Sequence, residues 1–307
     1  MQIFGCIKSN PDKFEFYSSS HDGIKLVSDE THNIQGKKIF VYIDGSISKV
    51  SNEIIKITRS YKSLESKLAY SYYAGLNIEN HVCGSFNLFI FDYSTKEFKI
   101  IRDTRGTRSI YYAKNRNDFL FSSNLKYIIN ELPKLTLNQN KLIEFLNWDY
   151  RSNAETYFEE IFRVIPSHFL NYNKEVLTTK QYTLDKGLFN DTNNKNHQEN
   201  FKKFLYRSVN NYANRGKKIG VMMSGGLDSS AIAIALKEND HNEVRTYSAN
   251  FNHIPNNNDL DETEYQKNIT EYTSFFHTQA EMEGKSPIIP IQKFTKELNQ
   301  PIIFPNL

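Results

Sequence analysis

The chain has 307 residues, of which 39% are hydrophobic and 24% are charged, as in globular proteins with room for two domains. A formal net charge of +3 gives no indication of binding to nucleic acid or to an acidic membrane. Two cysteines, Cys6 and Cys83, exclude a disulfide framework and a thiol-rich metal site. Neither a signal peptide nor an apolar run near the ~18 residues of a membrane span is present, so we expect a cytoplasmic protein.

Residues 1–185 are expected to form a first domain of mixed strands and helices. Helical spacing of Ile, Leu and Tyr occurs in residues 51–75 and 124–132. The segments 93–98 and 103–107 are predicted to be hairpin tips. Antiparallel strands mixed with helices favour a layered α+β domain. Strands are predicted at 1–7, 38–45, 84–93, 97–103, 108–114 and 118–123.

Residues 186–200 interrupt this pattern, because they are polar, rich in Asn and poor in apolar side chains. Such a composition predicts a linker. The remaining chain, 201–307, alternates helices with strands, which predicts the parallel sheet of an α/β domain. Helices are predicted here at 200–213 and 229–238, and strands at 217–223 and 244–251.

The turn between the first strand and the second helix of this domain has the composition of a phosphate-binding loop. Backbone N–H groups at a helix N-terminus attract anions, and glycines let a phosphate approach the backbone closely. The three serines would add hydroxyl donors, whereas Asp228 would repel a phosphate unless Mg²⁺ lay between them. The loop contains no lysine, which favours cleavage between the α- and β-phosphates over γ-phosphoryl transfer. Its residues are Ser224, Gly225, Gly226, Leu227, Asp228, Ser229 and Ser230.

This string resembles the S-G-G-x-D-S pyrophosphate loop of the N-type ATP pyrophosphatases, which activate an oxygen by adenylation and release pyrophosphate. The resemblance implies an adenine nucleotide hydrolase-like (PP-loop) domain that binds ATP, with Mg²⁺ held by Asp228. It also implies that the backbones of Met223 and Ala249 flank the adenine. Thiolating members of this superfamily normally use cysteines near the loop, and both cysteines of this chain lie in the other domain.

Residues 84–129 are similar to one segment of asparagine synthetase-type glutamine amidotransferase domains, and residues 158–170 resemble the segment between the two domains of that family. The resemblance implies an N-terminal-nucleophile (glutamine amidotransferase-like) sandwich followed by the PP-loop domain. We interpret Arg102-Asp103 as a buried pair that holds a hairpin. Tyr111 and Tyr112 are interpreted as core residues. The matching residues are Gly84, Phe86, Asp92, Arg102, Asp103, Gly106, Tyr111, Tyr112, Ser122 and Ser123.

The glutaminase chemistry of the family is predicted to be lost. The family begins with C-G-I-F-G, whose cysteine is the nucleophile, and Met1 stands at the place of that cysteine. Cys6 follows Ile-Phe-Gly, so its side chain is expected to lie inside a strand and not at a free tip, and it is interpreted as a small buried hydrophobe. The family's N-G-E-I-Y is here the segment 44–48, Asp-Gly-Ser-Ile-Ser, and Cys83 replaces the acid that would bind the ammonium group of glutamine. We therefore expect a catalytically inactive glutaminase-like domain.

Family members without the cysteine resemble β-lactam synthetases and lasso-peptide macrolactam cyclases, which adenylate a carboxylate and close a ring with an internal amine. The resemblance implies an ATP-dependent, AMP-forming, glutamine-independent amide ligase whose substrate is a carboxylate-bearing amino acid or peptide. Two alternatives stay open. One is an asparagine synthetase that uses ammonia or glutamine, and the other is a non-catalytic nucleotide-binding subunit or fragment.

In the family, a later segment supplies a second ATP-site motif and a basic residue, and the sequence ends before it, at "QPIIFPNL". We expect that a missing or separate C-terminal half, or a partner that processes a precursor peptide, completes the site. Two smaller candidates are interpreted as structural. Asp261-Glu262 is expected to be a solvated helix start, and His277 a histidine with satisfied hydrogen bonds.

Overall fold

The computed structural model divides the chain into two compact units, Met1–Asn190 with Ile289–Leu307, and Asp191–Ile288. No described helix is long and apolar enough to cross a membrane. The structure describes residues 2–8, 14–20, 23–116, 118–148, 152–185, 196–213, 218–250, 262–281, 288–298 and 300.

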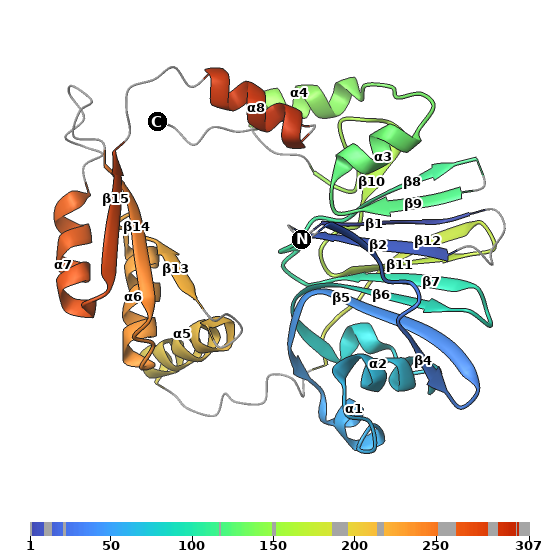
Figure 1. Ribbon diagram of the computed structural model, residues 1–307, viewed down its shortest axis with the longest axis horizontal. Helices are drawn as coiled ribbons and strands as arrows, with labels where there is room; N and C mark the ends of the chain where they lie inside the picture. The colour runs from blue at the N-terminus through green and yellow to red at the C-terminus, as the bar shows by residue number, and fades with distance from the viewer. Residues whose placement is uncertain are drawn as a thin grey trace. The chain divides into compact units, whose positions relative to one another are not determined.

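The first unit is built on two six-stranded antiparallel sheets (Figure 1). The order of the first sheet is β10-β8-β9-β1-β2-β3 and that of the second is β12-β11-β7-β6-β5-β4. The first sheet contains β1 (Gln2–Ile7), β2 (Phe14–Ser20), β3 (Gly23–Leu26), β8 (Tyr111–Asn115), β9 (Asp118–Ser122) and β10 (Ile161–Arg163). The second contains β4 (Thr31–Ile34), β5 (Lys37–Val50), β6 (Val82–Asp92), β7 (Glu97–Arg102), β11 (His168–Asn173) and β12 (Val176–Gln181).

All six predicted strands of this unit are confirmed, as β1, β5, β6, β7, β8 and β9. Residues 158–170, which resembled a segment between domains, instead contribute β10 and the start of β11 to the two sheets. Six further strands complete the two sheets: β2, β3 and β4 lie between β1 and β5 in the chain, and β10, β11 and β12 follow β9.

The alternation of side chains along β6 explains how the two sheets pack together. Phe89 and Phe91 point into the core between the sheets, where phenylalanines of both sheets meet. Leu88 and Ile90 point to the opposite face and pack against helices. Successive residues of a strand point to opposite faces, so a strand covered on both sides must be apolar throughout. This is why the sequence of β6, VCGSFNLFIFD, is almost continuously apolar.

Helices cover the outer faces of both sheets, which gives a layered sandwich. The predicted helical segment 51–75 forms two helices, α1 (Asn52–Ile57) and α2 (Leu64–Tyr73), whose apolar side chains join the outer core of the second sheet. Ser63 starts α2 by accepting a hydrogen bond from the N–H of Ser66, which explains the break. A 3₁₀ turn, η1, follows at Ile78–Asn80. α3 (Leu125–Glu131) packs on the first sheet, and α4 (Gln139–Trp148) follows it in the chain.

The second unit is a small α/β structure around the parallel sheet β13-β14-β15. The predicted parallel pairing is confirmed. Its helix α5 begins at His197, so the last four residues of the predicted linker, 197–200, are helical. The elements are α5 (His197–Ala213), β13 (Ile219–Met222), α6 (Leu227–Glu238), β14 (Val244–Asn250), α7 (Thr263–Thr273) and β15 (Phe276–Glu281). The last helix, α8 (Ile288–Leu298), belongs to the first unit from its second residue on.

Candidate functional site

The predicted phosphate loop joins the carboxyl end of β13 to the first turn of α6. Met223, the residue after the strand, is buried and donates its N–H to the carbonyl of Tyr247 at 2.7 Å. The helix begins with Gly226 as its N-cap, and no side chain caps its free N–H groups. Uncapped N–H groups at the positive end of a helix of this length are well suited to bind an anion.

Gly225 is required by the shape of the loop. Gly225 has a φ of +102°, which side chains other than that of glycine rarely tolerate. A Cβ at Gly225 would also lie 2.9 Å from the carbonyl oxygen of Glu262 and 3.2 Å from the Cβ of Tyr265. A Cβ at Gly226 would face the hydroxyl of Ser224 at 3.3 Å. The lack of a side chain at Gly225 therefore lets Glu262 and Tyr265 pack closely on the loop.

The three serines of the loop have different environments. The hydroxyl oxygen of Ser224 accepts a hydrogen bond from the N–H of Gly226 at 3.1 Å and lies 3.2 Å from that of Ser229. Ser230 is buried, and its hydroxyl donates to the carbonyl of Gly225 at 3.3 Å. Ser224 is exposed, whereas Ser229 is half-buried and donates its hydroxyl to the carbonyl of Gly226 at 3.2 Å. Ser224 and Ser229 thus lie on the outer side of the loop, and Ser230 holds it from inside.

Asp228 lies in the first turn of α6 and is exposed, as is Leu227 beside it. An exposed carboxylate in the same turn as uncapped N–H groups can hold a divalent cation while those N–H groups hold phosphate oxygens. The glycine backbone, the two surface hydroxyls and this carboxylate fit a Mg²⁺-bound polyphosphate. Bound Mg·ATP would supply an electrophilic phosphorus atom, and the cation would neutralise the negative charge of the surrounding phosphate oxygens.

The two residues predicted to flank adenine lie at the carboxyl ends of neighbouring parallel strands. Met223 directly follows β13, and Ala249 is the next-to-last residue of β14. Because Met222 is paired with Tyr247, both residues lie on the edge of the sheet from which the phosphate loop emerges. Ligands of open α/β sheets bind at this edge.

The start of α7 packs over the phosphate loop, which the interpretation of Glu262 as a solvated residue did not anticipate. Gln266, on the first turn of α7, donates its side-chain N–H to the carbonyl of Ser224 at 2.8 Å. Gln279 in turn donates to the Oε1 of Gln266 at 3.1 Å. Asp261 lies outside the described residues. These contacts fix the position of α7 relative to the loop.

Both ring nitrogens of His277 have partners, in agreement with a structural role. Nδ1 lies 2.8 Å from the hydroxyl of Thr246 and Nε2 lies 3.0 Å from that of Ser248. Burial lowers the pKa of His277, and the hydrogen bond with Thr246 opposes this effect in part.

In the first unit, Met1 lies outside the described residues. The segment that replaces N-G-E-I-Y forms part of β5, and its Asp44 is buried. One oxygen of Asp44 lies 3.1 Å from the guanidinium of Arg108, and the other accepts from the amide of Asn87 at 3.3 Å. Burial raises the pKa of Asp44, and Arg108 opposes this effect in part. Asp44 is thus engaged inside the protein.

The two cysteines show no feature of a nucleophile. Cys6 lies within β1, and burial raises the pKa of its thiol to about 12, with Asp118 adding to the effect. A thiol with such a pKa holds almost no reactive thiolate at neutral pH. Cys83 lies in β6, and its carbonyl accepts a hydrogen bond from the hydroxyl of Ser48 at 3.0 Å.

Arg102 and Asp103 are buried as predicted, but the predicted hairpin at 103–107 is wrong, because β7 and β8 belong to different sheets. The two residues instead hold the connection between these strands through separate hydrogen bonds. Arg102 donates to the carbonyls of Val164 at 2.6 Å and Gly106 at 2.8 Å. Asp103 accepts from the N–H and the hydroxyl of Thr107 at 3.1 and 2.7 Å. Tyr111 and Tyr112 were expected in the core, and both are buried.

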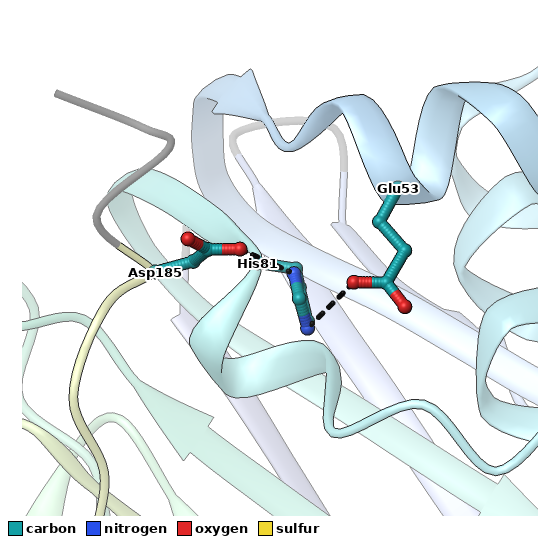
Figure 2. Close-up of side chains that lie close together, drawn as sticks. All are labelled: Glu53, His81 and Asp185. Atoms are coloured by element: carbon teal, nitrogen blue, oxygen red, sulfur yellow. Dashed lines mark ion pairs between the residues drawn. The ribbon is translucent and has the colours of Figure 1, made fainter. Parts of the chain in front are cut away.

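Glu53, His81 and Asp185 form a cluster that sequence reasoning missed (Figure 2). Among the described residues, these three are near enough to share a metal ion. The carboxylate of Glu53 lies 3.7 Å from Nε2 of His81, whereas that of Asp185 lies 3.6 Å from Nδ1. Because each carboxylate faces a different ring nitrogen, the arrangement suits ion pairing to the imidazole better than joint coordination of one ion. The residues are too far apart in sequence to give a motif.

The fold and the loop together define a class of protein: a glutamine amidotransferase-like sandwich followed in the chain by an α/β unit whose first strand leads into a helix through a glycine-containing loop. Comparison with family models gives the same two parts. A glutamine amidotransferase domain model matches residues 57–183, and an asparagine synthase model matches residues 200–305. The chain belongs to the asparagine synthetase family.

Individual relatives are distant. The chain is 22% identical over 229 residues to asparagine synthetase (glutamine-hydrolyzing) 2 of Bacillus subtilis, covering 65% of this chain and 30% of the relative. It is 24% identical over 170 residues to amidase chry2 of Gibberella zeae, covering 53% of this chain and 25% of that protein. The chain thus spans less than a third of the length of these two relatives.

Among solved structures, the chain is similar to that of an allosteric regulatory enzyme of purine biosynthesis, with a TM-score of 0.35 and 9% identity. That alignment covers 97% of this chain and 82% of the other.

Proposed function

We propose that this chain is the N-terminal portion of an ATP-dependent, AMP-forming amide ligase that does not use glutamine. In such a reaction a carboxylate displaces pyrophosphate from ATP to give an acyl adenylate. An amine then attacks the acyl carbon, AMP leaves, and the amine loses a proton. The single observation that carries the proposal is the loop of residues 224–230, which presents uncapped helix N–H groups, bare glycine backbone and an exposed carboxylate together.

The proposed independence from glutamine rests on the residues of the first unit. A glutaminase of this family needs a cysteine nucleophile, and Met1 stands in its place in the sequence. Cys6 cannot substitute for it, because its thiol is held neutral by burial within a strand. The carboxylate of Asp44, in the altered glutamine segment, is engaged by Arg108 and Asn87. We infer that the amine comes from the substrate itself, which makes ring closure within an amino acid or a peptide the proposed reaction.

The proposed requirement for a separate C-terminal half rests on the sheet of the second unit. Parallel sheets are normally covered on both faces. Here one face carries a row of exposed residues, namely Gly220, Met222, Arg245, Tyr247 and Phe276. Within the described part of the chain, β13 also pairs on one side only, with β14. A further strand beside β13 and a helix over the exposed face would complete the sheet next to the phosphate loop.

The proposal is tested first by calorimetric titration of Mg·ATP into the chain and into its Asp228→Ala variant. We expect the variant to bind at least about tenfold more weakly, because the cation loses its carboxylate ligand. Glu264→Ala is the matched control, since Glu264 is an exposed carboxylate of the same unit on the first turn of α7. Equal binding by the wild type and Asp228→Ala would contradict the assigned role of the loop.

Product analysis then separates the parts of the proposal. Incubation with glutamine should release no glutamate, and release of glutamate would contradict the loss of glutaminase activity. Once the C-terminal half is supplied, a ring-closing ligase should form AMP and pyrophosphate with an amino-acid or peptide substrate. Formation of AMP only with aspartate and ammonia would instead identify an ammonia-dependent asparagine synthetase.

A further inference from the structure

The carboxylate of Glu262 lies beside the backbone on which the phosphate loop would hold its anion. Its Oε1 is 3.8 Å from the position that a Cβ of Gly226 would occupy. Gly226 is the N-cap of α6, so this carboxylate faces the positive end of that helix. Sequence alone could not place it there, because Glu262 and Gly226 are separated by the whole of α6 and β14.

Backbone packing holds Glu262 in this place. A Cβ built on Gly225 would lie 2.9 Å from the carbonyl oxygen of Glu262 and 3.0 Å from its Cβ. Glu262 therefore packs directly on that glycine. The same carbonyl accepts the N–H of Gln266, whose side chain donates to the carbonyl of Ser224. The position of the backbone of Glu262 is therefore fixed relative to the loop.

The side chain of Glu262 makes no bond within its own helix. Glu262 is the N-cap residue of α7, a position where a side-chain oxygen commonly accepts a hydrogen bond from the helix N–H groups. Here no such side-chain bond is formed. A carboxylate that does not cap α7 and lies over the start of α6 is available to a ligand of the loop.

We infer that Glu262 makes binding of polyphosphate at this loop depend on a divalent cation. This inference rests on the proposed function, because it assumes that the loop binds the phosphates of ATP. Without a cation, the carboxylate and the polyphosphate compete for the same positive helix end and repel each other. With a cation between them, the carboxylate contributes an oxygen ligand, as hard cations such as Mg²⁺ prefer. Glu262 thus acts as a second carboxylate beside Asp228 and favours the metal-bound nucleotide.

The test uses inorganic pyrophosphate, since its binding requires the loop but neither the adenine site nor a C-terminal half. Calorimetry measures its affinity for the wild type and for Glu262→Gln, each with Mg²⁺ and with EDTA. We expect the wild type to bind pyrophosphate much more tightly with Mg²⁺. In Glu262→Gln the gain from Mg²⁺ should fall by roughly tenfold, with tighter binding in EDTA and weaker binding in Mg²⁺. The amide keeps the size of the side chain and leaves the backbone contacts with Gly225 and Gln266 intact.

Glu264→Gln is the matched control, because it removes the same charge from the same helix at an exposed position. It should leave the gain from Mg²⁺ unchanged, which separates a local effect from that of net charge. A gain that is equal in the wild type and in Glu262→Gln would overturn the inference while leaving the proposed function standing. Failure of the folded wild type to bind pyrophosphate in either condition would overturn the proposed function and this inference with it.

Discussion

The strands β6 and β14 each lie inside a sheet, yet their surroundings differ. β6 has apolar side chains on both faces, packed against the opposite sheet on one side and against helices on the other. β14 has buried residues on one face only: Val244, Thr246 and Ser248 are buried, whereas Arg245 and Tyr247 are exposed. Within the described residues, the strand inside the first unit is therefore covered on both faces and the strand inside the second unit on one face only.

This difference bears on which part of the chain can act alone. In the first unit, a core of aromatic rings joins the two sheets, and we propose that its glutaminase chemistry is lost. In the second unit, which carries the proposed phosphate loop, the buried core is small: Ala213, Val221, Leu236, Val244 and Phe275. The more completely packed unit is the one that we propose to be a scaffold, and the functional loop lies on the less completely packed one.

The largest effect is expected from Phe89→Ala in the first unit. Phe89 is fully buried, with ring centroids of Phe16 and Phe121 at 5.0 and 5.8 Å. Removing the ring should lower the free energy of unfolding by about 3–5 kcal/mol, since the layered core cannot collapse around the cavity. Phe275→Ala, in the small core of the second unit, should cost about 3 kcal/mol, the low end of this range. Urea unfolding followed by circular dichroism measures both, and a greater loss for Phe275→Ala would reverse the comparison.

A smaller, pH-dependent effect is expected from His277 in the second unit. Burial lowers the pKa of His277 in the folded chain, so the unfolded chain binds a proton more readily. This contribution to stability is present above the unfolded pKa of about 6.5 and is lost as the pH falls below it. His277→Asn should therefore lose less stability than the wild type between pH 7.5 and pH 5.5. Amide hydrogen exchange of β14 and β15 at both pH values measures this loss of stability. Equal losses in the wild type and in His277→Asn would contradict the prediction.

The smallest effect is expected from Phe276→Ser on the open face of the second sheet. Phe276 is 66% exposed, so its loss should change the free energy of unfolding by no more than ~0.5 kcal/mol. Thermal unfolding of the chain measures this change. A loss above ~2 kcal/mol would show that the face is covered in solution, and would make the two sheets more alike than the structure indicates.

The fold could be predicted from the sequence wherever side chains followed a clear period. β6 contains the apolar run Leu88–Phe91 and half of the residues of β7 are apolar, and the change from antiparallel to alternating elements correctly predicted a parallel sheet. Among the missed strands, β12 lacks such a signal. β12 has the sequence VLTTKQ and is mostly exposed at the end of its sheet, so burial imposes no apolar pattern on it. Hydrophobic periodicity reports burial, and edge strands are buried too little to show it.

The candidate site was predictable only where its residues adjoin in sequence. The string from Ser224 to Ser230 contains its own geometry, because a strand, a tight turn and a helix start follow one another. Glu262 reaches the loop through the packing of α7, and His81 meets Glu53 and Asp185 through the arrangement of three separate segments. Such contacts depend on tertiary structure, which no local pattern specifies.

The unpaired side of β13 also has a consequence for how the chain can be produced and maintained. A strand edge with free N–H and C=O groups beside exposed apolar side chains is a template for pairing with any extended polypeptide. The lifetime of the isolated chain is then set by how soon that edge is covered. Under the proposed assembly, the abundance of this chain in a cell would follow the supply of its complementary half, and synthesis in excess would end in aggregation or degradation.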